Sequence, residues 1–211
     1  GDLVAFWMQF DDPETRIWFR RFSPDGEPLG DFQSVTTVDR RLPVALDVAV
    51  ADGSLHVAWA TTNFVIPGFV IIETRSFDHG TLNPLGPARL LQGILGYSEL
   101  GIAGRDGGPV VATWTDFDPG GAAEVGVVGR ELGPDGAASS DLFRADLGDN
   151  LSADFSDLAV DGFGNIVVVW SSAETPGFDP PRDIRAQRFL STDDPSPRLA
   201  ARNSGDMKID R

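Results

Sequence analysis

Acidic side chains are the residues of this chain whose types and spacing could do chemistry. Four acids each stand at the head of a short apolar run, and further acids gather in segments rich in proline and glycine. Paired carboxylates carry out acid and base catalysis on glycosides, and clustered carboxylates bind calcium. The head-of-run acids are Asp47, Glu99, Asp157 and Asp206, and the clustered acids are Asp11, Asp12, Asp116, Asp118 and Asp179.

The head-of-run acids recur at similar places along the chain, and this recurrence favours a structural role. A carboxylate pair that cleaves a glycoside needs two unlike environments, whereas equivalent repeats provide similar ones. Four arginines recur in the same manner, so we expect one ion pair per repeat or one carboxylate that caps backbone amides. These arginines are Arg21, Arg75, Arg130 and Arg188.

Other catalytic signals are missing from the sequence. His56 and His79 are the only histidines; His56 lies in an apolar run and is expected in the core, whereas His79 lies in a turn. There is no Gly-x-Ser-x-Gly, no His-x-x-x-His and no phosphate-binding loop. The chain also has no cysteine, which excludes disulfides and thiolate chemistry. We therefore expect no enzyme.

The clustered acids predict either a solvated acidic rim or a cation-binding rim. Calcium takes about six to eight oxygen ligands. No ordered Asp-x-Asp-x-Asp-Gly loop is present to supply them. We therefore expect a solvated rim and no cofactor, with calcium as the alternative.

The elements that must position these residues are repeated. An apolar run that ends in tryptophan occurs four times, at a period of about 55 residues, which indicates stacked supersecondary units. The run is too uniformly apolar for a half-exposed strand, so we expect a strand buried on both faces. The repeated tryptophans, which we expect to be structural core residues, are Trp7, Trp59, Trp114 and Trp170.

Each tryptophan strand has predicted neighbours. A short acid-headed strand precedes it, a strand ending near the repeated arginine follows it, and a fourth short strand comes last, with Gly, Asp and Pro turns between them. The sequence thus predicts an all-β, single-domain β-propeller over 1–211 with four four-stranded antiparallel blades. Their approximate bounds are 1–40 plus 205–211, 43–93, 97–148 and 154–203.

The first repeat lacks its acid-headed strand at the N-terminus. Asp206-Met207-Lys208-Ile209-Asp210 matches Asp157-Leu158-Ala159-Val160-Asp161 in its order of acidic and apolar positions. We therefore expect the C-terminal segment to pair with the N-terminal blade and close the propeller, which would also remove an open sheet edge. Exchange of this strand between two chains would instead give a homo-oligomer.

Three phrases carry a family resemblance. They are Gly164-Asn165-Ile166-Val167-Val168-Val169-Trp170, Asp183-Ile184-Arg185-Ala186-Gln187-Arg188-Phe189 and Arg21-Phe22-Ser23-Pro24-Asp25-Gly26-Glu27-Pro28-Leu29-Gly30. This chain resembles the propeller-type repeats of large secreted or surface proteins of bacteria. The resemblance implies an extracellular, cell-surface or periplasmic location, and it brings no catalytic residues. Ser76 and Glu131 depart from the phenylalanine of the pattern.

Net charge limits the partners. The formal charge is −15, and Lys208 is the only lysine. So acidic a surface repels phosphate backbones, so we expect no nucleic-acid partner. No apolar stretch reaches the length of a membrane-spanning helix, and this chain shows no signal peptide.

One loop after a tryptophan strand is apolar where the others are acidic. Its residues either fold inward or form a contact surface for a partner. We expect a non-catalytic interaction or structural module that binds a protein partner or larger assembly through its loop face. The first alternative is carbohydrate binding, with Trp18, Phe117 or Phe178 stacked on a sugar, and the second is a glycoside-acting enzyme. The apolar loop residues are Phe64, Val65, Ile66, Pro67 and Phe69.

Overall fold

A computed structural model describes most of the chain and is all-β. The described residues are 2–11, 14–63, 66, 68–96, 99–117, 125–146, 152–173 and 183–190. Within these ranges the chain forms four antiparallel sheets and no helix. The described part accordingly offers no helix of the length and apolarity needed to cross a membrane.

The strands follow one another in sequence order within each sheet. Sheets B and C have four strands, and sheets A and D have three among the described residues. Sheet A contains β1 (Leu3–Asp11), β2 (Glu14–Phe22) and β3 (Gln33–Asp39); sheet B contains β4 (Arg41–Ala51), β5 (Ser54–Asn63), β6 (Phe69–Asp78) and β7 (Arg89–Leu95); sheet C contains β8 (Leu100–Gly104), β9 (Val110–Asp116), β10 (Gly126–Leu132) and β11 (Phe143–Arg144); sheet D contains β12 (Ser152–Val160), β13 (Ile166–Ala173) and β14 (Asp183–Phe189).

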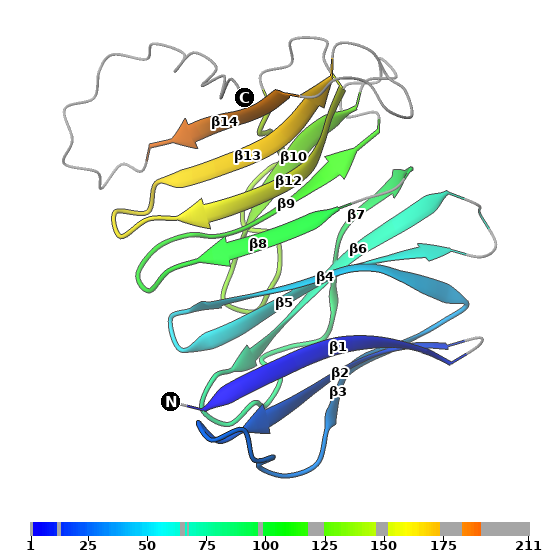
Figure 1. Ribbon diagram of the computed structural model, residues 1–211, viewed down its shortest axis with the longest axis vertical. Helices are drawn as coiled ribbons and strands as arrows, with labels where there is room; N and C mark the ends of the chain where they lie inside the picture. Colours follow the sequence, from blue (N-terminus) through cyan, green and yellow to red (C-terminus); the bar gives the residue numbers. More distant parts are fainter. Residues whose placement is uncertain are drawn as a thin grey trace.

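The sheets are stacked face to face like the blades of a propeller. Figure 1 shows them in the order A, B, C and D, with the N-terminus at one end of the stack and β14 at the other. Close packing runs from β1 to β4, from β4 to β8 and from β8 to β12. The segments 191–203 and 205–211, expected to supply a strand to the fourth and first blades, lie outside the described residues.

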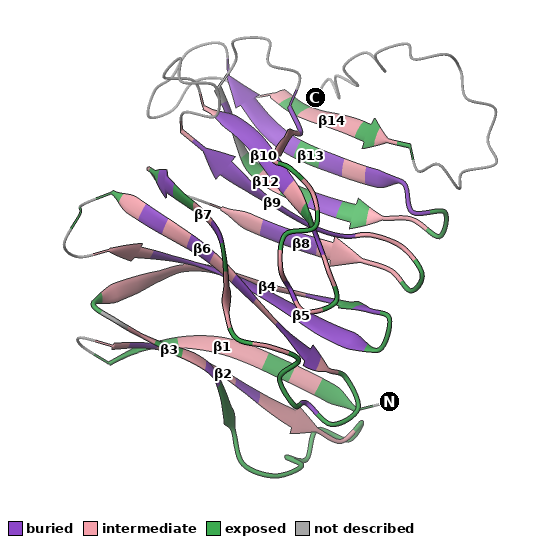
Figure 2. Cartoon of the chain, turned by 180° about the vertical axis from the view of Figure 1, so that it is seen from behind, coloured by how far each residue is buried: buried purple, intermediate pink, exposed green. Residues whose placement is uncertain are grey.

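Three apolar clusters between the sheets form the core, and each holds one repeated tryptophan. Trp59 lies between sheets A and B, Trp114 between B and C, and Trp170 between C and D. Trp59 and Trp114 are fully buried, and Trp170 is 2% exposed. Figure 2 shows the resulting concentration of buried residues in the middle strands of sheets B, C and D. Trp7 is only half-buried because it lies on the face of sheet A that points away from sheet B.

Strand register corrects one expected equivalence among the acids. The residue before the buried tryptophan pairs with Asp47 in sheet B, with Gly101 in sheet C and with Asp157 in sheet D. Glu99 therefore lies two residues before the position that Asp47 and Asp157 occupy. The turn between β8 and β9 is longer than that between β4 and β5, and this difference hides the offset in the sequence.

Candidate functional site

The outward face of sheet A, meaning the face away from sheet B, carries a pair of tryptophans. Strict alternation along β2 positions them: Ile17 and Phe19 are buried against sheet B, so Trp18 between them points outward. Trp18 pairs directly with Trp7 of β1. Directly opposed residues of antiparallel strands share one face, so the two indoles lie side by side.

Phe32 completes an aromatic cluster on this face. Its ring lies edge-on to both indoles, with centroids 6.4 Å from Trp7 and 5.2 Å from Trp18. Phe32 is 55% exposed, and both tryptophans are half-buried. The indole Nε1 of Trp18 has no hydrogen-bond partner in the described part of the chain. That nitrogen is buried, so the cluster offers a ligand the partly exposed faces of its rings and not the indole donor.

Polar side chains flank the aromatic cluster on the same face. Gln9 opposes Arg16, and Asp11 opposes Glu14. Gln9 donates to Asp11 over 2.9 Å, and Arg16 donates to Glu14 over 2.8 Å. The hydrogen bond and charge of Glu14 raise the pKa of Arg16 above its usual value, so the guanidinium stays charged. On the other flank, Arg20 donates to the Gly30 carbonyl over 2.9 Å.

The same place in sheet B is built differently. There the tryptophan Trp59 opposes Glu73, and its Nε1 donates to that carboxylate over 3.3 Å. Arg41 also donates to Glu73, over 2.8 Å, and Trp59 is fully buried in the cluster between sheets A and B. Sheet A has Trp18 in place of Glu73. The sequence marked Trp18 as a tryptophan outside the repeat, but it gave no signal for Phe32, whose contact comes through the turn before β3.

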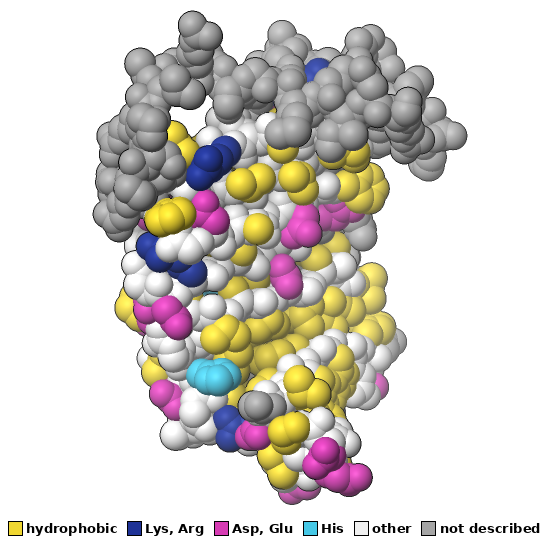
Figure 3. Space-filling view, turned by 60° about the vertical axis from the view of Figure 1, so that its left-hand side comes forward, with side chains coloured by type: hydrophobic (Ala, Val, Ile, Leu, Met, Phe, Trp, Pro, Cys, Tyr) yellow, Lys and Arg dark blue, Asp and Glu magenta, His cyan; other side chains and the backbone are white. Residues whose placement is uncertain are grey.

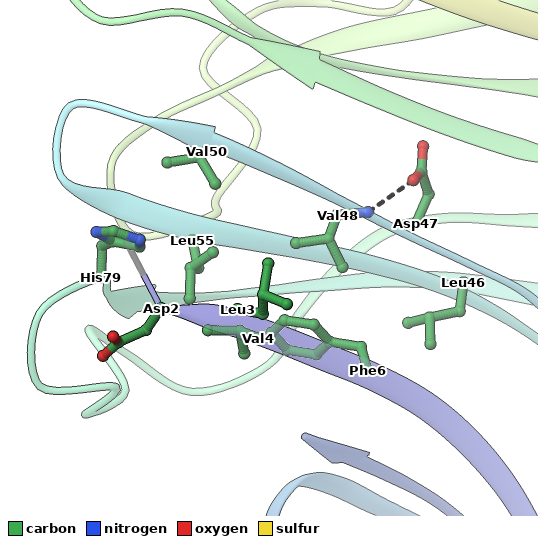
Figure 4. A pocket seen from close by; sticks show the side chains of 10 residues that line it. All are labelled: Asp2, Leu3, Val4, Phe6, Leu46, Asp47, Val48, Val50, Leu55 and His79. Carbon is green, nitrogen blue, oxygen red and sulfur yellow. Dashed lines mark hydrogen bonds between the residues drawn. The ribbon is translucent and has the colours of Figure 1, made fainter. Parts of the chain in front are cut away.

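A cleft of about 440 Å³ opens between β1 and β4. Figure 3 shows hydrophobic side chains lining the hollow between the two sheets. In Figure 4, Val4, Phe6, Leu46 and Leu55 lie along it, and Asp2 and His79 lie together at one end, whereas Asp47 points away from β1. The cleft is therefore apolar along its length and polar at one end.

Two of the repeated acids, Asp47 and Asp157, accept hydrogen bonds from backbone amides. Asp47 accepts hydrogen bonds from the amides of Val48 and of Ile102 in sheet C, both over 2.8 Å. Asp157 accepts one from the Leu158 amide, also over 2.8 Å. Asp47 thus links two sheets, and Asp206 lies outside the described residues.

The repeated arginines contact turns and, for Arg75, also strand β3. Arg21, Arg75 and Arg130 donate to backbone carbonyls, and Arg188 lies 3.4 Å from the carboxylate of Asp161. The accepting carbonyls are those of His79 and Gly80 for Arg21, of Gly86 and Val35 for Arg75, and of Ser140 for Arg130. Arg21 and Arg75 therefore join sheets A and B.

The predicted partner loop and acidic rim are described only in part. Ile66 is 51% exposed, and Phe69 is half-buried at the start of β6, with its ring over Gly93. Asp11 is exposed, whereas Asp116 is buried at the end of β9. The described residues contain no cluster of acids and histidines able to hold a metal, and calcium binding stays a prediction. The residues outside the described ranges are Phe64, Val65, Pro67, Asp12, Asp118 and Asp179.

The two histidines occupy unlike places. His56 is 2% exposed, and its Nδ1 lies 2.9 Å from the Ser76 hydroxyl. Burial lowers the pKa of His56 below its usual value, because the charged imidazolium would lose its hydration. His79 is exposed in the turn after β6. The buried pair lies in the core, away from any described opening.

Comparison with known proteins returns likeness of fold alone. No family model matches the chain, and no curated protein matches it. Among solved structures, the α-L-arabinofuranosidase from Lactobacillus brevis is 13% identical with a TM-score of 0.44, covering 90% of this chain and 74% of its own. The α-L-arabinanase from Cellvibrio cellulosa is 10% identical with a TM-score of 0.42, covering 90% and 71%. A thermostable family-43 glycoside hydrolase is 13% identical with a TM-score of 0.38, covering 91% and 77%.

These findings correct the functional expectation from the sequence. We expected a non-catalytic protein-binding module and no enzyme, whereas the solved structures that resemble this chain are glycoside hydrolases. The expectation of a propeller-type, all-β fold agrees with them.

Proposed function

We propose that this protein binds carbohydrate on the outward face of sheet A. The observation that carries the proposal is the cross-strand pair of Trp7 and Trp18, which is half-buried beside the exposed ring of Phe32 and flanked by polar side chains. The apolar face of a sugar ring stacks on an aromatic ring, while its hydroxyls require hydrogen-bond partners. Both kinds of contact are offered on one face.

The polar groups have the chemistry that sugar hydroxyls need. Gln9 and Arg16 supply donors, and Asp11 supplies acceptors. These side chains lie on the same face as Trp7 and Trp18, further along β1 and β2. Each already holds a neighbour in place, so little side-chain freedom would be lost on binding. The strands below are rigid supports for a binding face.

Binding to a panel of arabinan, xylan, cellulose and chitin oligosaccharides tests the proposal. We expect at least one oligosaccharide to bind and Trp18→Ala to weaken that binding about tenfold or more, which corresponds to about 1.4 kcal/mol. Phe163→Ala is the matched control, because Phe163 is also an exposed aromatic, 52% exposed, but lies in the turn of sheet D. Equal losses in both variants, or no binding by the wild-type protein, would refute the proposal.

We also infer that the four sheets are four blades of one domain. Sheets B and C support this inference, because each has the predicted four strands in sequence order. Sheets A and D have the same order with three described strands each. A location at the cell surface or outside the cell is proposed with it, in keeping with a carbohydrate ligand.

A further inference from the structure

A cavity of about 710 Å³ lies between sheets C and D. Its volume falls in the range of small-molecule binding sites. Apolar side chains from both sheets form much of its wall, and sheet C adds two acids, Glu131 at the end of β10 and Asp141 just before β11. None of the described residues that line the cavity is basic. The cavity is therefore apolar with two negative groups.

Two phenylalanines meet across this cavity. Phe143 of β11 and Phe189 of β14 both line it, and their rings pack edge to face with centroids 5.6 Å apart. Phe143 fits there because it pairs with Gly129, where a Cβ would lie only 2.7 Å from the ring. Both phenylalanines are half-buried, so part of each ring is left for a ligand. The face of an aromatic ring attracts cations as well as apolar groups.

Strand register places Glu131 on the face of sheet C that meets sheet D. Glu131 opposes Val111, which is fully buried between these two sheets, and opposed residues share a face. Arg21 holds the same position in sheet A, because it opposes Val4, three residues before the tryptophan. Arg21 donates to two carbonyls of sheet B, which a carboxylate cannot do because it only accepts. Glu131 is thus an acceptor on a face where sheets pack together.

Neither Glu131 nor Asp141 has a carboxylate partner within the described part of the chain. The amide of Glu131 donates to Ser140 Oγ over 2.9 Å, and that hydroxyl donates to the Asp141 carbonyl over 2.8 Å. These hydrogen bonds fix the backbone that carries both acids. Both side chains are exposed. Asp135, in the turn between β10 and β11, differs because it pairs with Arg89 over 2.9 Å.

We propose that this cavity binds an organic cation with an apolar body. The apolar body would contact Leu142, Phe143 and Phe189, and the cationic group would lie between a ring face and the carboxylates of Glu131 and Asp141. The formal charge of −15 attracts cations to the opening and repels anions. The cavity is remote from the outward face of sheet A, so this proposal and carbohydrate binding can fail separately.

Calorimetric titration with three ligands of similar skeleton tests the proposal. At neutral pH phenethylamine is a cation, phenylethanol is neutral and phenylacetate is an anion. We expect phenethylamine to bind about tenfold more tightly than phenylethanol, and phenylacetate to bind most weakly. The double variant Glu131→Gln with Asp141→Asn should weaken phenethylamine binding about fivefold and leave phenylethanol binding unchanged, because both acids are exposed and contribute only through their charge.

Asp25→Asn with Glu27→Gln is the matched control. It removes the same two charges from exposed positions between β2 and β3, far from the cavity. Equal weakening in the control, or unchanged phenethylamine binding in the Glu131 and Asp141 variant, would overturn the assignment to this cavity. Phenylethanol or phenylacetate binding as tightly as phenethylamine would overturn the preference for a cation. No binding of phenethylamine to the wild-type protein would overturn the whole proposal.

Discussion

Replacing Asp47 with alanine tests the idea that one carboxylate joins two sheets. The variant removes hydrogen bonds to the Val48 and Ile102 amides, and Ile102 is only 5% exposed, so its amide would lose its acceptor where water has little access. Hydrogen bonds to charged groups contribute about 1.5–3 kcal/mol each. Asp47 is half-buried, so solvent screens part of this, and we expect a loss of about 2–4 kcal/mol in unfolding free energy.

Asp157→Ala is the matched control. Asp157 holds the same register position and accepts the same bond from the following amide, over the same 2.8 Å, but it is exposed and joins no second described sheet. We expect Asp157→Ala to lower the unfolding free energy by about 1 kcal/mol or less. Urea unfolding followed by circular dichroism measures both variants, with stability read from the midpoint at unchanged slope. Equal losses would refute the inter-sheet role of Asp47.

Three further predictions concern the core. Trp59→Ala should lower the unfolding free energy by about 3–5 kcal/mol, measured by urea unfolding, because Trp59 is fully buried. Trp7→Ala should lower it clearly less, because Trp7 is only half-buried. Equal losses in the two variants would contradict this prediction. Gly129→Ala should destabilise by about 1–3 kcal/mol, because the new methyl would lie 2.8 Å from the Ala112 carbonyl oxygen, whereas Gly162→Ala meets no atom within 4 Å and should be near neutral. Because the pKa of His56 is lowered in the folded protein, the unfolded chain takes up a proton at His56 at a higher pH than the folded chain does. The melting temperature should therefore fall as pH drops below about 6.5. His56→Gln should make the melting temperature depend less on pH in this range.

The repeat made most of the fold predictable. The tryptophan phrases identified β5 and β9 because a strand buried on both faces must be apolar throughout, and turn residues marked their ends. They also identified β13, but the expectation of burial on both faces was wrong there, because Val169 is 36% exposed. Register was less accessible. Glu99 looked equivalent to Asp47 because both are acids before an apolar run, but cross-strand pairing, which depends on turn length, puts Gly101 there.

The candidate site was harder to predict for a related reason. A sequence repeat shows which residues occupy equivalent strand positions, whereas a binding site depends on which side chains contact one another in the folded protein. Trp18 follows the alternation of β2, so its face could be worked out from Ile17 and Phe19. Its contact with Phe32 could not, because Phe32 comes from beyond β2, in the turn before β3, and turn geometry is not encoded by periodicity.

The position of a repeated residue does not decide its role. Trp7 and Trp59 occupy the same place in their strands, yet Trp59 is buried by sheet A and donates to Glu73, whereas Trp7 lies at the end of the described stack beside a second tryptophan. A sheet that must accept another sheet needs a flat apolar face with its polar atoms paired. Sheet A departs from this requirement on its outward face, where Trp7 and Trp18 are only half-buried and the adjacent Phe32 is 55% exposed. This exposed aromatic cluster is why ligand binding is assigned to this face and not to the buried tryptophans.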